Sequence, residues 1–155
     1  MHDNLLRTLQ GLRPTILERW ETLLRAEPVT SPLANPDSLV YLMNWTLDRF
    51  LAVLRGPVAR RRISERGSNK PAYIEESKLC PCKMNPLLAY FSTGEQALVQ
   101  ALLPTLEPRE RENVLSSVRL AMQAVAKREI DTFCAVCQRR HDEHPNTASR
   151  CGSGR

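Results

Sequence analysis

The chain has 155 residues, of which 42% are hydrophobic and 25% charged, a balance typical of one globular domain that needs no disulfides for its size. No stretch approaches the roughly 20 uninterrupted apolar residues of a membrane span, and the N-terminal residues lack the pattern of a secretory signal peptide. We therefore expect a cytoplasmic protein that makes no membrane contact. The formal net charge of +5 comes mostly from arginine and brings nucleic acid into consideration as a partner.

Leucines at helical spacing predict a first helix over residues 5–12. A second apolar pattern over residues 16–24 follows Pro14, a residue that suits the start of a helix or a kink. Two tryptophans, Trp20 and Trp45, fall among leucines at helical spacing. We expect both indole rings in the core.

The most apolar segment of the chain predicts a central helix over residues 39–54. Asn35 and Pro36 mark its start, because asparagine caps helices and proline is tolerated in the first turn. Gly56 and Pro57 mark its end. Since this helix is apolar on most of its faces, we expect the others to pack around it.

Two further helices are predicted in the second half of the chain. The first begins at Pro86 and ends before Pro104, with Gly94 as an interior weak point. The second begins near Pro108 and carries apolar residues as far as Val136. A short connection between the two predicts a helical hairpin.

Residues 57–85 form the longest segment without helical periodicity, and long loops inside compact domains usually serve a function. The sequence predicts an all-α fold, a four- or five-helix up-and-down bundle with this long loop between the second and third main helices. We expect a single domain over residues 1–144. Residues 145–155 are expected to form a disordered tail, because they offer nothing to bury.

Four of the five cysteines fall in two doublets, Cys80-Pro81-Cys82 and Cys134-Ala135-Val136-Cys137. In a non-secreted chain, cysteines indicate metal binding or thiol chemistry more than structural disulfides. A free cysteine is also a common small residue of protein cores, but isolated core residues would not explain the pairing. We therefore predict that the two doublets converge on one centre.

Helical geometry allows this convergence. Pro86 is expected level with about residue 125 of the last helix, and the extended residues before Pro86 can cover the length of about nine helical residues. This count brings Cys82 near Cys134 and the other two cysteines, Cys80 and Cys137, near each other. On a helix, positions three apart lie about 60° from one another, so both sulfurs can bind one centre.

Four thiolates suit tetrahedral zinc in a closed site, which favours a structural or redox-responsive role. An iron–sulfur cluster is the alternative, since it takes the same ligands, and a metal-free dithiol switch is a third. His141 shares the helical face of Cys134 and Cys137, and we interpret it as a solvated residue or a neighbour of the ligands, with direct ligation as the alternative. Cys151, in the predicted tail, is expected to lie outside the site.

The paired doublets of Cys80, Cys82, Cys134 and Cys137 resemble the zinc redox switch of the oxidation-activated bacterial chaperone family. In that family the doublets lie closer together, in a small C-terminal domain. The resemblance implies that oxidants could eject the metal and form disulfides. It does not imply chaperone activity.

The segments LRPTILERW at 12–20 and FSTGEQAL at 91–98 resemble the N-terminal helical domain of RsbR-type stress-regulator co-antagonists and related bacterial sensors. This resemblance covers residues 1–135 and implies a four-helix sensory or protein-interaction module. The 155 residues contain no match to the output domain that follows in those regulators, so we expect no such domain. Signalling would therefore require a separate protein partner.

No phosphate-binding glycine loop, nucleophile elbow or paired acids appear, so we expect no enzymatic activity. Arg60, Arg61 and Arg62 could bind phosphates, but few aromatic residues accompany them and a solvated loop is favoured over a nucleic-acid site. The sequence thus predicts a sensor or adaptor whose metal site clamps residues 57–85 to the last helix. A protein partner is favoured over nucleic acid, and a homo-oligomer is compatible with the sequence.

Overall fold

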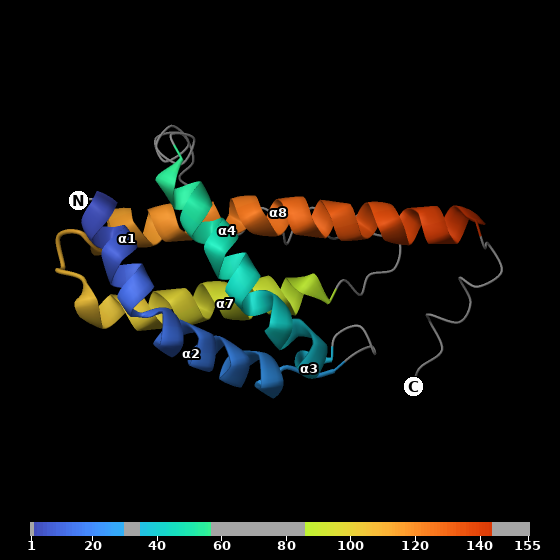
Figure 1. Cartoon of the computed structure of the whole chain (residues 1–155), viewed down its shortest axis with the longest axis horizontal. Helices are drawn as coiled ribbons and strands as arrows, with labels where there is room; N and C mark the ends of the chain where they lie inside the picture. Colours follow the sequence, from blue (N-terminus) through green and yellow to red (C-terminus); the bar gives the residue numbers. More distant parts are fainter. Residues whose placement is uncertain (1, 30–34, 57–85, 144–155) are drawn as a thin grey trace.

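A computed structural model describes residues 2–29, 35–56 and 86–143, and every element in these ranges is helical, which confirms the predicted all-α bundle (Figure 1). The predicted 57–85 loop and 145–155 tail lie outside the described residues. The elements are α1 (His2–Gly11), α2 (Arg13–Ala26), α3 (Pro36–Leu39), η2 (Val40–Leu42), α4 (Met43–Arg55), α7 (Leu87–Leu102), η4 (Leu103–Thr105) and α8 (Arg111–Glu143).

The helix boundaries follow the proline and asparagine signals of the sequence. Pro14 occupies the first turn of α2, where its missing N–H is not needed. The side chain of Asn35 accepts a hydrogen bond from the backbone N–H of Asp37 at 3.0 Å and so caps α3. At the other end of this run, α4 stops at Gly56 as predicted.

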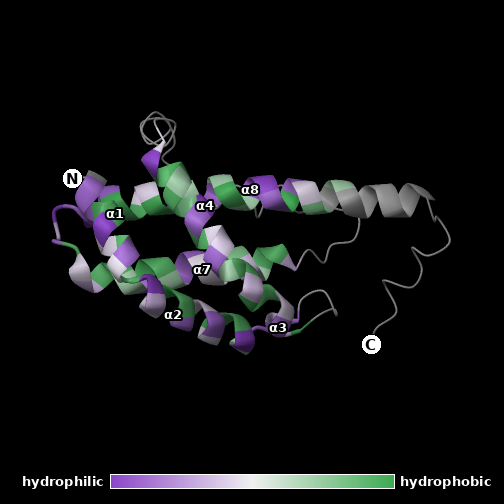
Figure 2. Ribbon diagram, in the orientation of Figure 1, coloured by the Kyte–Doolittle hydropathy of each residue, from purple (hydrophilic) through white to green (hydrophobic). Residues whose placement is uncertain are grey.

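Helix α7 occupies the middle of the bundle, packed against α2 on one side and α8 on the other, and α4 crosses α8 (Figure 1). Figure 2 shows the corresponding difference in composition, since α7 is largely hydrophobic whereas α2 alternates polar and apolar residues. The sequence led us to expect the helix over 39–54 in this central place. In the structure α7 takes this place, because it packs against both α2 and α8, whereas the main contact of α4 is with α8.

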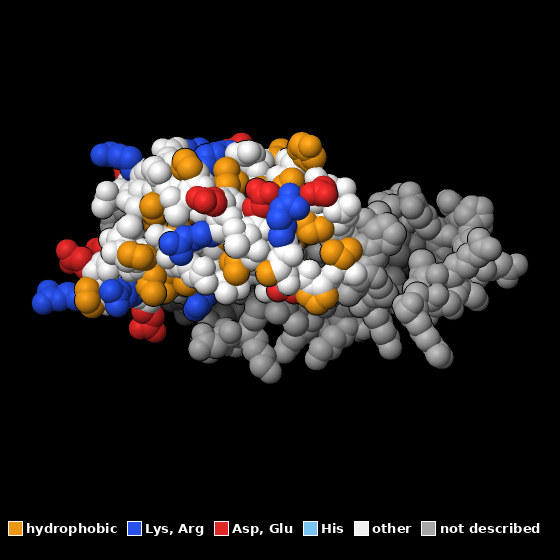
Figure 3. Space-filling model, turned by 90° about the horizontal axis from the view of Figure 1, so that it is seen from below, with side chains coloured by type: hydrophobic (Ala, Val, Ile, Leu, Met, Phe, Trp, Pro, Cys, Tyr) orange, Lys and Arg blue, Asp and Glu red, His pale blue; other side chains and the backbone are white. Residues whose placement is uncertain are grey.

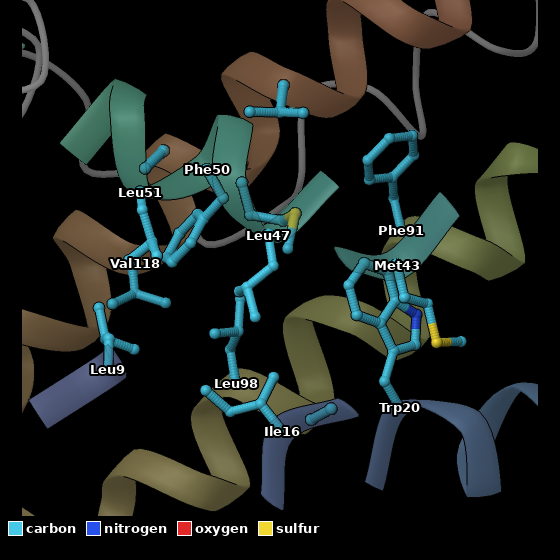
Figure 4. Close-up of a cluster of buried hydrophobic side chains, with 14 of the residues drawn as sticks. Leu9, Ile16, Trp20, Met43, Leu47, Phe50, Leu51, Phe91, Leu98 and Val118 are labelled. Carbon is cyan, nitrogen blue, oxygen red and sulfur yellow. The ribbon is translucent and has the colours of Figure 1, made fainter. Parts of the chain in front are cut away.

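The core draws apolar side chains from all five main helices (Figure 4). Its largest fully buried members are Trp20, Tyr90, Phe50, Phe91, Leu9, Ile16, Leu47, Leu54, Leu98, Leu102, Met122 and Val118. The predicted burial of Trp20 is confirmed.

The indole ring of Trp20 packs directly on Gly94 of α7. A Cβ atom at Gly94 would lie 2.6 Å from two carbons of this ring, closer than any ordinary contact. The indole Nε1 also donates a hydrogen bond of 2.9 Å to the backbone carbonyl of Tyr90. The sequence marked Gly94 as a weak point in a helix. In the structure, the missing side chain is what lets α2 and α7 approach.

The predicted burial of Trp45 is wrong, because 47% of this residue is exposed. Thr46, its neighbour, faces the core instead and is hydrogen-bonded there. A hydroxyl can enter a core when a partner oxygen is available, so the polar residue took the inward position and the larger apolar one turned outward.

The face of α2 seen from below carries acidic, basic and apolar side chains side by side (Figure 3).

Candidate functional site

The four predicted metal ligands fall in two different parts of the chain. Cys80 and Cys82 lie outside the described residues. Cys134 and Cys137 belong to α8, whose helical course the structure describes at both positions. The helical spacing on which their shared face depends is therefore present, with positions three apart separated by about 60° around the axis.

Helix α8 is much longer than the helix it packs on. Its 33 residues span about 50 Å, against about 24 Å for the 16 residues of α7. Among the side chains that the structure describes, the last one of α8 in the buried core is that of Ile130. Beyond that point α8 continues past the other described helices (Figure 1). The positions of Cys134 and Cys137 lie on this projecting part.

An ion pair fixes the register between the two helices of the hairpin. The Arg119 Nε atom of α8 lies 3.6 Å from the Glu95 Oε1 atom of α7. Counting outward from this pair at equal rise places Pro86 level with about residue 128, three positions further along α8 than the sequence led us to expect. The chain therefore enters α7 within about 9–14 Å, along the helix axis, of the level of the two α8 cysteines.

Glu95 is the one side chain in the described ranges with a buried polar atom that lacks a hydrogen-bond partner, its Oε2 atom. Its side chain is only 16% exposed. Burial raises the pKa of this carboxyl because the charged form loses hydration, while Arg119 acts in the opposite direction. The carboxylate is thus held in a place that favours its protonated form.

Replacing Glu95 by methionine should stabilise the protein at pH 7, by an amount of the order of 1 kcal/mol. A raised pKa means that the folded protein binds this proton more tightly than the unfolded chain does, so ionisation of Glu95 opposes folding as the pH rises. The pH-dependent part of the gain should therefore be complete above the raised pKa of the folded protein and shrink as the pH falls from there toward the ordinary carboxyl value of 4.5, below which little of it remains. Urea unfolding curves at several pH values measure it.

Gln96→Met provides the control, because Gln96 is an exposed neutral neighbour on the same helix. Its effect should be small and independent of pH. A Glu95→Met variant less stable than the native chain at pH 7 would mean that the pair with Arg119 outweighs the burial of the carboxylate.

A second polar group lies in the core and is fully hydrogen-bonded. The Tyr90 hydroxyl and the Thr46 hydroxyl are 2.9 Å apart, and Thr93 donates to the carbonyl of Tyr90 at 3.0 Å. Burial raises the pKa of Tyr90 well above its ordinary range, so the phenol stays protonated. Because each hydroxyl has a partner and none is exposed, this network serves to position α2, α4 and α7 rather than to react. Sequence reasoning missed it, since isolated threonines carry no pattern.

A third feature lies on the surface, where α4 crosses α8. The guanidinium of Arg49 lies 4.6 Å from the centre of the Trp45 ring and also binds Glu129 of α8 at 2.9 Å. Trp45 is therefore held in one orientation although it faces solvent.

In the part of the chain that the structure describes, no three His, Cys, Asp or Glu side chains gather closely enough to bind a metal ion. Across the same ranges, no helix is both long and apolar enough to cross a membrane. Comparison with known proteins finds no matching family model, and no curated protein or solved structure is significantly similar to the chain. Both family resemblances stay predictions.

Proposed function

We propose that the chain is a cytoplasmic, non-enzymatic sensor or adaptor in which Cys80, Cys82, Cys134 and Cys137 hold one zinc ion. The observation that carries this proposal is the pair of cysteine doublets, of which one falls on the projecting part of α8 and the other shortly before α7 begins. Zinc bound by four thiolates carries a net charge of −2 and leaves no open position for a substrate. A regulatory role follows from this ligand set.

The register of the hairpin supports the proposal. Pro86 follows Cys82 by four positions, so this stretch of chain spans up to about 13 Å when extended. Pro86 is level with about residue 128, and the same length along α8 reaches about residue 137. Cys82 is therefore within reach of the level of either cysteine on α8, and Cys80 is within reach of both.

The distribution of charge suggests what such a site would control. The described helices carry nearly equal numbers of acidic and basic residues, so the positive excess of the chain comes from residues 57–85 and 144–155. A metal ion bound by all four thiolates would hold Cys80 and Cys82 against α8. It would thereby restrain the segment that contains Arg60, Arg61 and Arg62. An oxidant such as hydrogen peroxide would take two electrons from each cysteine pair and leave disulfides and water. The metal would be released, and the arginines would become available to an acidic partner protein.

Native mass spectrometry of the full chain purified under reducing conditions tests the site. We expect one zinc ion per chain, lost when any one of the four cysteines is changed to serine. Cys151→Ser is the matched control and should keep the metal. Hydrogen peroxide should release the zinc from the native chain, measured with a colorimetric chelator.

Two results would contradict the zinc site. A protein that carries no metal, or in which Cys151→Ser loses it as readily as the other variants, would reject the proposed ligand set. A brown colour with visible absorbance after anaerobic purification would replace zinc with an iron–sulfur cluster on the same four cysteines.

A further inference from the structure

The outward face of α4, together with the 3-10 turn η2 that precedes it, carries two large aromatic residues and a small one in a row. Tyr41 is 85% exposed and Trp45 is 47% exposed, and Ala52 is exposed two turns further along the helix. At about 100° per residue of α-helix, Trp45 and Ala52 fall within about 20° of one another around the α4 axis. Tyr41 lies one turn before Trp45, in η2. Neighbouring exposed aromatic side chains often mark a contact with another protein.

The acidic group on this face is already paired within the chain. The Asp48 carboxylate, between the aromatic and the small residue, accepts a hydrogen bond of 2.6 Å from Arg13 of α2. This guanidinium holds the pKa of Asp48 below its usual range. Asp48 therefore stays ionised but paired, so two such faces can meet without bringing together two unpaired carboxylates.

The order of residues makes the face complementary to itself. Trp45 and Ala52 lie at nearly equal distances on either side of Asp48, and so do Tyr41 and Arg55. In an antiparallel pair of such helices related by a two-fold axis at Asp48, each large residue therefore meets a small one, and each exposed tyrosine meets an arginine.

We propose that the α4 face forms a two-fold symmetric dimer with a second copy of the chain. Trp45 packs on Ala52 of the partner subunit, and the ring of Tyr41 lies against Arg55 of the partner subunit. An alanine allows the helices to approach closely, and an arginine over an aromatic ring is favourable. The contact between Trp45 and Arg49 restrains the indole before association, which reduces the entropy lost on binding. A face one helix wide is small for a stable interface, so we expect dissociation in the micromolar range.

Sedimentation velocity of the full chain under reducing conditions, over a range of concentrations, tests this dimer. Ala52→Trp should weaken association at least tenfold, because two indoles then compete for one space, and Trp45→Ala should weaken it by removing the aromatic anchor. The double variant Trp45→Ala/Ala52→Trp exchanges the large and small positions. It should return to within about threefold of the native dissociation constant, because each subunit again matches the other.

Leu103→Ala is the control, since Leu103 is an exposed apolar residue between α7 and α8 and lies outside the α4 face. It should leave the dimer unchanged. Far-UV circular dichroism checks that each variant is folded, which is expected for substitutions at exposed positions. A native chain that remains monomeric at several hundred micromolar, an Ala52→Trp variant that associates like the native chain, or a double variant that fails to recover would each overturn the proposal.

Discussion

Gly94→Ala is expected to lower the free energy of unfolding by about 1–3 kcal/mol. Alanine is favoured over glycine by about 1 kcal/mol inside a helix, so helix propensity alone predicts the opposite sign. The new methyl group would, however, lie 2.6 Å from the ring of Trp20, which is completely buried and cannot turn aside. Since α2 and α7 would have to move apart, the loss of packing outweighs the gain in propensity. Thermal and urea unfolding measure the difference.

Gly11→Ala is the matched control for this prediction. Gly11 is also in a helix, and a Cβ atom there would meet nothing within 4 Å. The substitution should be neutral or stabilising by up to about 1 kcal/mol. If Gly94→Ala proved as stable as Gly11→Ala, the close approach of α2 to α7 would not exist in solution.

Tyr90→Phe is expected to destabilise the protein by about 1–3 kcal/mol, because it leaves the buried Thr46 hydroxyl without its 2.9 Å partner. Thr46→Val should cost a similar amount by leaving the Tyr90 hydroxyl unpaired. The double variant removes both polar groups and replaces threonine with a side chain of the same shape. We expect it to be more stable than the sum of the two single changes predicts.

A double-mutant cycle by urea unfolding measures this coupling, which should lie at about 0.5–3 kcal/mol. Tyr41→Phe is the control, because Tyr41 is the most exposed tyrosine described and its hydroxyl faces solvent. Its effect on stability should stay within about 0.5 kcal/mol. Additive effects of Tyr90→Phe and Thr46→Val would mean that the two hydroxyls do not interact.

The fold was largely predictable because nearby residues determine where its helices begin and end. Pro14, Asn35 and Gly56 act within one helical turn, so their effect does not depend on distant parts of the chain. The orientation of the two tryptophans could not be predicted, because Trp20 and Trp45 occupy similar leucine-rich patterns. The packing of α4 as a whole decides which residues turn inward, and Thr46 lies on its buried face, where it meets Tyr90, 44 positions away.

In the candidate site too, the features that nearby residues determine could be predicted, and those that depend on distant parts of the chain could not. The spacing of Cys134 and Cys137 could be predicted, since it requires only that the chain be helical there. The predicted level of Pro86 along α8 differs by three positions from the level that the ion pair between Glu95 and Arg119 sets. The difference arises because the geometry of the turn between α7 and α8 cannot be derived from helical rise alone. Cys80 and Cys82 lie outside the described residues, so their part of the site stays a prediction.

The contacts of α2 with α7 and of α4 with α8 join the two halves of the chain across residues 57–85. The stability of the bundle depends on the length of that connection only through the entropy of bringing its ends together. This entropy grows with the logarithm of length, so doubling the segment would cost only about 0.6 kcal/mol. Evolution can therefore lengthen, shorten or rewrite residues 57–85 with little penalty in folding. A constraint on their length would then point to the proposed contact of Cys80 and Cys82 with α8 and not to the folding of the bundle.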